Sequence, residues 1–330
     1  MRAYKKQNKT ISNVQTQDLA YQQPETQKRA SAHRNLETFM IDCINLTHYY
    51  GKRCIYENLS FSVPRGRILG LLGKNGTGKT TTINILSGFL KPRSGECRIF
   101  GQNIIGMNPE LRRDIGLLIE GHVQYSFMTI RQIERFYARF YPKWDKNVYY
   151  DLMSMLKVAP NQRISRMSCG QRSQVALGLL MAQNPQVLIL DDFSLGLDPG
   201  YRRLFIDYLR DFVKSSERTV FLTSHIIQDM EKLIDDCIIM DYGKILLQMP
   251  VNELLEKYRQ YNLKLTDNSD LSGIEDIFHP MAMHGNVEFG SFLEMDKLQS
   301  LLQSKGIKYE NLTSQKVNLE DAFIGLTGKY

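Results

Sequence analysis

Long apolar stretches are missing from this sequence of 330 residues. The longest uninterrupted run, Val175–Ala182, has eight residues, whereas a membrane-spanning helix needs about twenty. Cysteine pairs are missing too: the five cysteines are scattered, so we expect free thiols in a reducing compartment and no zinc site. With 42% hydrophobic and 23% charged residues, the composition excludes a mostly disordered or collagen-like chain and a small disulfide scaffold. We therefore expect a globular protein of about two domains with no helix that crosses a membrane.

The excess of positive charge is small and uneven. The net charge is +7, of which residues 1–37 supply +4, because they hold seven Lys or Arg residues against three acidic ones. This segment is rich in Gln, Lys, Thr and Ser and lacks apolar periodicity, so it predicts a disordered basic tail. A solvated arm and attraction to an anionic membrane surface both fit such a tail, and we expect no nucleic-acid partner.

Short apolar runs bounded by turn residues begin at Phe39 and alternate with helical patterns. Several are apolar throughout, which is typical of strands in a parallel sheet that is covered on both faces. We expect an α/β domain over 38–250, with a mostly helical segment at about 122–183 that includes an amphipathic helix over Gln171–Gln183. Residues 251–330 predict a small accessory domain that ends on an amphipathic helix. The expected strands are Phe39–Leu46, Leu59–Val63, Ile68–Leu72, Glu96–Phe100, Val187–Leu190, Thr219–Leu222, Asn262–Thr266 and Ile307–Tyr309.

A glycine-rich loop follows the apolar run Ile68–Leu72 and precedes an apolar helix start. It has the spacing GxxxxGK[ST], in which the glycines let successive backbone N–H groups turn toward one anion. Lys79 can neutralise the charge of the β- and γ-phosphates, and the Thr80 hydroxyl can coordinate Mg²⁺. The spacing and its context predict that the chain binds a nucleoside triphosphate. The expected phosphate-binding residues are Gly73, Lys74, Asn75, Gly76, Thr77, Gly78, Lys79, Thr80 and Thr81.

A pair of carboxylates, Asp191 and Asp192, ends the apolar run Val187–Leu190. A carboxylate at the tip of a buried strand beside the phosphate loop can hold Mg²⁺, a role that suits Asp191. The next residue can orient the water that attacks the γ-phosphate, which makes Asp192 the candidate catalytic residue. An Asp pair at a strand end is also a common helix cap, but the phosphate loop upstream favours the catalytic interpretation.

The order of these motifs resembles that of the ABC-type ATPases from about Phe39 to Lys329. The resemblance implies an α/β fold, a P-loop NTPase of the ABC ATPase type. Such a fold has a RecA-like parallel sheet core, an antiparallel β subdomain and an α-helical signature subdomain, here followed by a small C-terminal α/β domain. In that family the signature of one subunit closes over the γ-phosphate that the other subunit holds. The residues similar to the signature are Ser168, Cys169, Gly170 and Gln171.

Three further segments match the family in order. Tyr50 stands where an aromatic ring stacks on adenine, with the adjacent Tyr49 as a competitor. Gly196-Leu197-Asp198 resembles the D-loop that couples the two sites of a dimer. His225 follows the apolar run that begins at Thr219 and resembles the switch histidine, which would contact the γ-phosphate as a further catalytic residue.

Some positions depart from the commonest ABC sequence. The segment Ile115–Glu120, interpreted as a loop, ends in Glu120 where most members carry Gln, as in the branch that includes bacitracin-resistance and lantibiotic-immunity ATPases. Glu120 can still reach Mg²⁺ or the attacking water, so it is a candidate for both the metal and the catalytic set. Cys169 replaces a signature glycine, and Phe193 replaces the usual proline. Asp192 replaces the usual Glu and retracts the carboxylate by about 1–1.5 Å, where a misplacement of about 1 Å can cost on the order of 100-fold in rate.

The resemblance implies an ATP-hydrolysing motor subunit of an ABC-2 type exporter, with ATP and Mg²⁺ as cofactors. Two copies, as a homodimer or in a heterodimer, would sandwich two ATP molecules and drive a separately encoded polytopic transmembrane permease from the cytoplasmic face of the membrane. The aromatic-rich segment 122–145 is the implied docking surface. Asp192 leaves open an alternative, a catalytically weak ATP-binding subunit that gates a more active partner. A soluble ABC ATPase is a third interpretation, and residues 251–330 could either stabilise a dimer or regulate it.

Overall fold

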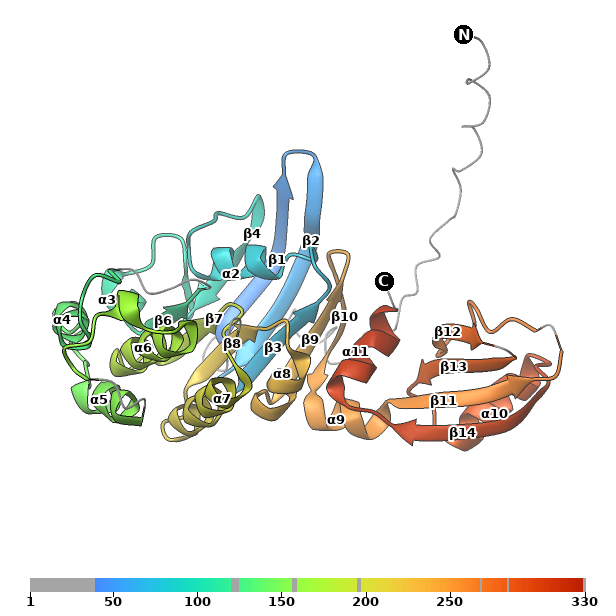
Figure 1. Ribbon diagram of the computed structural model, residues 1–330. Coiled ribbons are helices and arrows are strands. Elements are labelled where there is room, and N and C mark those ends of the chain that lie inside the picture. The colour runs from blue at the N-terminus through green and yellow to red at the C-terminus, as the bar shows by residue number, and fades with distance from the viewer. Residues whose placement is uncertain are drawn as a thin grey trace, which may run out of the picture. The chain divides into compact units, whose positions relative to one another are not determined.

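The structure is a computed structural model that describes residues 39–119, 125–155, 159–194, 197–267, 269–283 and 285–328. Within these residues the chain forms one six-stranded sheet and two four-stranded sheets (Figure 1). The predicted tail over 1–37 and the candidate Glu120 lie outside the described residues. None of the helices in the described part of the chain is long and apolar enough to cross a membrane.

The six-stranded sheet is the core of the larger, N-terminal part of the described chain. Its strand order is β10-β9-β3-β8-β7-β6, and all neighbours pair in parallel except β10, which forms an antiparallel hairpin with β9. The carboxyl ends of the parallel strands meet at one edge, where ligands bind in open α/β sheets. The strands are β3 (Ile68–Gly73), β6 (Ile115–Leu118), β7 (Val187–Leu190), β8 (Thr219–Thr223), β9 (Asp236–Asp241) and β10 (Lys244–Pro250).

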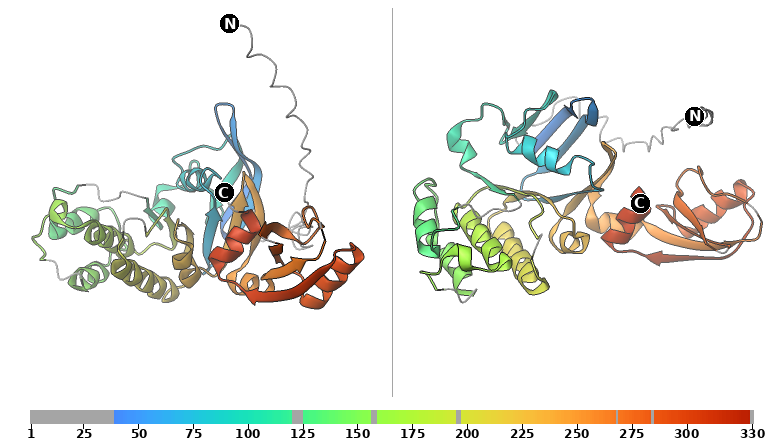
Figure 2. Two further views of the ribbon diagram at one scale, coloured as in Figure 1. Left: turned by 45° about the vertical axis from the view of Figure 1, so that its right-hand side comes forward. Right: turned by 45° about the horizontal axis from the view of Figure 1, so that its top comes forward.

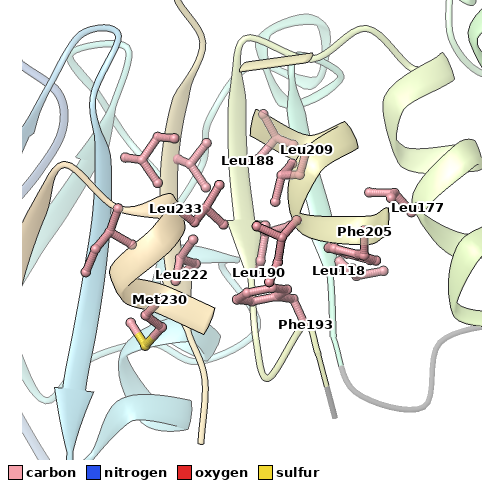
Figure 3. Packing of buried hydrophobic residues seen from close by; sticks show 14 of the residues in the cluster. Leu118, Leu177, Leu188, Leu190, Phe193, Phe205, Leu209, Leu222, Met230 and Leu233 are labelled. Atoms are coloured by element: carbon pink, nitrogen blue, oxygen red, sulfur yellow. The ribbon is translucent and has the colours of Figure 1, made fainter. Parts of the chain in front are cut away.

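Both faces of this sheet are covered. Along β7, Leu188 and Leu190 point to one face and Val187 and Ile189 to the other, because side chains alternate along a strand. The first face is covered by α6 (Cys169–Ala182), α7 (Pro199–Lys214) and α8 (Ile227–Leu233), as Figure 3 shows. The second face is covered by α2 (Lys79–Leu86) and by a four-stranded antiparallel sheet. That sheet has the order β2-β1-β4-β5 and consists of β1 (Phe39–Tyr50), β2 (Arg53–Pro64), β4 (Ser94–Ile99) and β5 (Gln102–Asn103).

A helical region lies between β6 and β7 in the chain. It contains α4 (Ile130–Tyr137), α5 (Lys146–Met155), the short 3-10 helix Ile164–Arg166 and α6; the short α3 (Pro109–Arg112) precedes β6. The prediction that α6 is amphipathic is wrong, because every residue from Gln174 to Ala182 is buried. Even the polar Gln174 fits the core, since its side-chain amide donates to the carbonyl of Tyr201 on α7 at 3.1 Å.

The C-terminal part, drawn in orange to red, forms the third sheet (Figure 2), and the strand order of this sheet is β12-β13-β11-β14. It has a hydrophobic core of its own, which includes Tyr261, Phe289 and Leu298. The last helix, α11, instead buries Phe323 and Leu326 in the same cluster as Leu222 of β8. The elements are α9 (Val251–Lys257), β11 (Arg259–Leu265), β12 (Phe278–Met283), β13 (Asn286–Ser291), α10 (Met295–Ser304), β14 (Tyr309–Lys316) and α11 (Leu319–Thr327).

The predicted fold class is confirmed: a parallel core, an antiparallel β part, a helical part and a small C-terminal α/β part are all present. Two local expectations need correction. The segment interpreted as the loop Ile115–Glu120 begins with β6, which pairs in parallel with β7 at the edge of the core sheet. The run Ile307–Tyr309 reaches only the first residue of the last strand, because β14 begins at Tyr309 and pairs with β11 from there.

Candidate nucleotide-binding site

The loop between β3 and α2 carries the predicted phosphate-binding residues Gly73–Thr81. Gly78, at the start of α2, has a φ of +103°, a left-handed conformation that favours glycine, and no side chain caps the helix there. A Cβ at Gly78 would lie 2.8 Å from Ile55 and 2.9 Å from Tyr56, so this position has no room for a side chain. The uncapped N–H groups and the helix dipole together form an anion site.

Lys79 is folded back onto its own loop. Its ammonium donates to the carbonyl oxygens of Gly73 at 2.7 Å and Lys74 at 3.1 Å. Burial lowers the pKa of this ammonium, while the carboxylates of Asp192 and Asp191 oppose the shift. These carbonyl bonds hold the positive charge of Lys79 within the loop.

Thr223, the last residue of the neighbouring strand β8, contacts the carboxylate of Asp191 and the backbone of Asp192. Its hydroxyl donates to Asp191 Oδ1 at 2.6 Å and accepts from the backbone N–H of Asp192 at 3.2 Å. Asp191 and Thr223 are both buried. We assigned no role to Thr223 from the sequence, and the only signal for it was its place just before Ser224 and the candidate switch histidine.

Asp192 lies against His225. One carboxylate oxygen accepts from the backbone N–H of His225 at 3.0 Å, and the other is 2.9 Å from His225 Nε2. The φ of Asp192 is +45°, a left-handed conformation that Asp tolerates better than most residues. Burial raises the pKa of the Asp192 carboxyl and Asp191 adds to this rise, while His225 acts in the opposite direction.

Of the remaining candidate site residues, the structure describes Thr80 and Asp198 but not Glu120. Thr80 lies in the first turn of α2, where its side chain is exposed. Glu120 lies outside the described residues, and so does Gly196 of the predicted D-loop. Asp198 is described, and its carboxylate caps α7 by accepting from the backbone N–H of Tyr201 at 3.2 Å.

The signature residues form the N-terminus of α6. Ser168 and Gln171 make a reciprocal capping box, in which the Ser168 hydroxyl accepts from the Gln171 N–H at 3.2 Å and the Gln171 side chain accepts from the Ser168 N–H at 3.1 Å. Cys169 is exposed, and a Cβ at Gly170 would lie 2.8 Å from the ring of Tyr201. These contacts join the signature to the start of α7 rather than to the phosphate loop of the same chain.

The two tyrosines at the end of β1 have different surroundings. Tyr49 donates its hydroxyl to the carboxylate of Glu57. Tyr50 is 50% exposed, and its ring meets His48 edge to face at a centroid distance of 4.9 Å. This difference favours Tyr50 over Tyr49 as the ring that stacks on a base.

A phosphate loop, two strand-end carboxylates and a histidine at one sheet edge are the parts of a P-loop nucleoside triphosphatase. Residues 56–194 match the ABC transporter family. The chain is 31% identical to the bacitracin transport ATP-binding protein BcrA of Bacillus licheniformis, over 88% of this chain and 97% of that protein. It is 27% identical to the Nod factor export ATP-binding protein I of Cupriavidus metallidurans, over 88% of this chain and 98% of that protein. The chain therefore belongs to the ATP-binding subunits of ABC transporters, and it is an ATPase. The predicted similarity to the bacitracin-resistance branch is confirmed.

Solved structures support the fold. The ATP-binding subunit of an ABC transporter superposes with a TM-score of 0.59 at 24% identity, over 66% of this chain and 92% of that chain. A dimeric ATP-binding cassette in a post-hydrolysis state, bound to ADP and Pi, gives a TM-score of 0.56 at 20% identity, over 64% of this chain and 98% of that chain.

Proposed function

We propose that the chain is the motor subunit of an ABC exporter, in which two copies enclose two ATP molecules. The arrangement of the anion-binding groups carries the proposal. The loop Gly73–Thr81, the carboxylates and His225 meet at one edge of the sheet, whereas the signature at Ser168 is joined to α7. A second copy of the chain would bring its own signature helix to the γ-phosphate and complete the site.

Each residue has a role in that reaction. The N-terminus of α2 and Lys79 bind the β- and γ-phosphates, and Tyr50 stacks on the base. Asp192 orients the attacking water and accepts its proton, while His225 holds the Asp192 carboxylate and contacts the γ-phosphate. Asp191 and Thr80, with Glu120, offer the oxygen ligands that Mg²⁺ prefers, and the bound ion would neutralise phosphate charge.

A cluster of exposed aromatic rings supports docking of a transmembrane permease. Tyr125 contacts Phe127 and Phe136 at centroid distances of 6.2 and 5.1 Å, and Phe136 contacts Phe140 at 5.2 Å. Phe127 and Phe140 are 66% and 56% exposed, although large apolar rings are normally covered. The names of the relatives, a bacitracin transporter and Nod factor exporters, favour an exporter. We infer a separately encoded permease, and a position on the cytoplasmic face of the membrane.

One observation favours the alternative of a catalytically weak gating subunit. Both carboxylate oxygens of Asp192 are engaged by His225, and the side chain is one methylene shorter than the usual Glu. A carboxylate held in this way has to exchange a partner before it can hold water. Under this alternative the chain binds ATP tightly, and a more active partner hydrolyses it.

Steady-state ATP hydrolysis by the purified chain distinguishes the two, with Asp192→Glu beside it and Lys79→Ala as the blank. Turnover that depends on Lys79 in the native chain supports a self-sufficient motor. A silent native chain that Asp192→Glu converts into an active one supports the gating subunit. Copurification from membranes tests the partner: we expect a polytopic membrane protein, and recovery in a purely soluble complex would contradict the exporter.

A further inference from the structure

The last helix of the chain, α11, ends against the phosphate loop. The ammonium of Lys74, the second residue of the loop, donates to the carbonyl of Thr327 at 2.6 Å. Thr327 is buried and lies in the last turn of α11, where helix carbonyls lack intrahelical partners and carry partial negative charge. The carbonyl end of a helix is therefore a favourable partner for this lysine.

The accessory sheet holds the same end of α11. His279 on β12 has its Nε2 3.2 Å from the carbonyl of Leu326, the residue next to Thr327. A Cβ at Gly328, which follows α11, would lie 2.9 Å from the His279 ring. Two adjacent carbonyls of α11 are thus contacted by two different parts of the fold, that of Thr327 by the phosphate loop and that of Leu326 by the accessory sheet.

Close packing leaves α11 little freedom to move against that sheet. The Tyr258 hydroxyl occupies the space between β13 and α11: a Cβ at Gly290 would lie 1.6 Å from it, and one at Gly325 would lie 2.2 Å from it. Any shift of α11 along the sheet would drive this buried ring into a backbone, because both facing positions already lack side chains.

The other end of α11 meets the helix that follows the candidate switch histidine. Glu231 on α8 accepts from the backbone N–H of Leu319 at 2.8 Å, and Gln228 donates to Glu320 at 3.0 Å. Helix α8 begins at Ile227, two residues after His225. α11 therefore contacts both the phosphate loop, at Lys74, and helix α8, which follows His225.

We propose that α11 positions the phosphate loop, with Lys74 as the positioning residue that its carbonyl end holds. The proposal rests on ATP binding at this loop. Fixing Lys74 holds the loop in its binding conformation before the nucleotide arrives, so less ordering is left for ATP to bring about. The affinity for MgATP then depends on the C-terminal part of the chain, through a contact that touches no nucleotide.

His279→Asn is the decisive variant, measured by MgATP affinity, KM and kcat on the full-length chain. Asn tolerates the φ of +43° at this position, but its shorter side chain does not reach the carbonyl of Leu326. Lys74→Met removes the ammonium and keeps the length of the side chain, and Lys74→Arg restores a donor. Lys91→Met is the matched control, because it removes an exposed lysine that follows α2.

We expect Lys74→Met and His279→Asn each to raise KM and weaken MgATP binding by about three- to tenfold, with kcat little changed. The double variant should be no worse than the stronger single one, because both act through the same helix end. Lys74→Arg should restore most of the affinity, and Lys91→Met should bind as the native chain does.

Native affinity in a folded His279→Asn, as judged by its melting temperature, would overturn the proposal, even if Lys74→Met binds weakly. In that case Lys74 would act on the phosphates directly. Tighter MgATP binding by His279→Asn would also overturn the proposal, because it would mean that α11 holds the loop in a conformation that binds ATP less well. Lys79→Met separates this inference from the proposed function: if it binds MgATP as the native chain does, the ATP site itself is wrong.

Discussion

Asp192 contacts His225 through both of its carboxylate oxygens, one at the backbone N–H and one at Nε2 of the ring. The side chain of Asp192 is 12% exposed and that of His225 is 47% exposed, so the pair has a buried half and an open half. The two contacts fix the position of the Asp192 carboxylate, while the exposed side of the His225 imidazole stays accessible from solvent.

Replacing Asp192 with Asn should lower kcat by about 100-fold or more and leave MgATP affinity within a few-fold of native. Asn tolerates the left-handed backbone at 192 and still accepts from the His225 N–H, but it cannot take up a proton. Single-turnover hydrolysis and equilibrium nucleotide binding separate the two effects. Asp207→Asn on α7 is the control, because Asp207 pairs with Arg203 at the surface. Native kcat in Asp192→Asn would exclude Asp192 as the catalytic residue.

Much of the fold could be predicted because its signals are local. Strands β3, β7 and β8 are buried except for Gly73 at the end of β3, and apart from the threonines at the two ends of β8 they consist of apolar residues and glycine, which is the pattern of a parallel sheet covered on both faces. The phosphate loop could be predicted for the same reason, since its glycines, lysine and threonine are contiguous in the chain. Its uncapped helix start at Gly78 is the geometry that this spacing favours.

The corrections come from contacts between distant residues. β6 has only four residues and contains Gly116, a poor strand residue, yet a Cβ there would lie 2.6 Å from Leu180 of α6 and 2.8 Å from Pro185. The close packing of α6 and Pro185 against β6 requires a glycine at position 116, and the sequence around Gly116 does not show this requirement. The same holds for Gln174, which is polar but buried, because its partner is a carbonyl on α7.

The departures at 192 and 193 also have a structural account. A proline at 193 would restrict the backbone of residue 192, because the residue before proline is pushed toward extended conformations. Phe193 removes that restriction, and Asp192 has a φ of +45°. The Phe193 ring stacks on Phe205 of α7 at 5.4 Å, so it fills the core. The absence of proline at 193 therefore agrees with the left-handed backbone of Asp192.

Thr223→Val should lower kcat and weaken MgATP binding, although the two side chains have almost the same shape. The substitution leaves Asp191 Oδ1 and the Asp192 N–H without the hydroxyl that joins them, and an unpaired buried polar group costs about 1–3 kcal/mol. Thr223→Ser keeps the hydroxyl and should recover most of the activity. Equal losses in the Val and Ser variants would mean that the methyl group matters and the hydrogen bonds do not.

Phe127→Ser should release the chain from membranes without lowering its melting temperature. Phe127 is 66% exposed, so its ring adds little to the core, but it belongs to the aromatic cluster that we assign to permease docking. Phe89, just after α2, has the same exposure and lies outside that cluster, which makes Phe89→Ser the matched control. The measurement is the membrane-bound fraction of each variant in the native host. Release by both variants, or by neither, would exclude this cluster as the docking surface.

Cys169 offers a direct test of the dimer, because a thiol stands in the signature itself. Cys43, Cys97 and Cys237 are buried, so in a Cys54→Ser background Cys169 is the exposed thiol of the described residues. If the signature of one copy closes over the γ-phosphate held by the other, MgATP should slow maleimide labelling of Cys169 severalfold.

Asp192→Asn should prolong this protection by slowing hydrolysis, and Lys79→Met should abolish it by removing the phosphate contact. If the labelling rate of Cys169 in the Asp192→Asn chain is the same with and without MgATP, the shared site is contradicted. Protection that persists in Lys79→Met would show that the thiol is shielded by something other than nucleotide-driven closure.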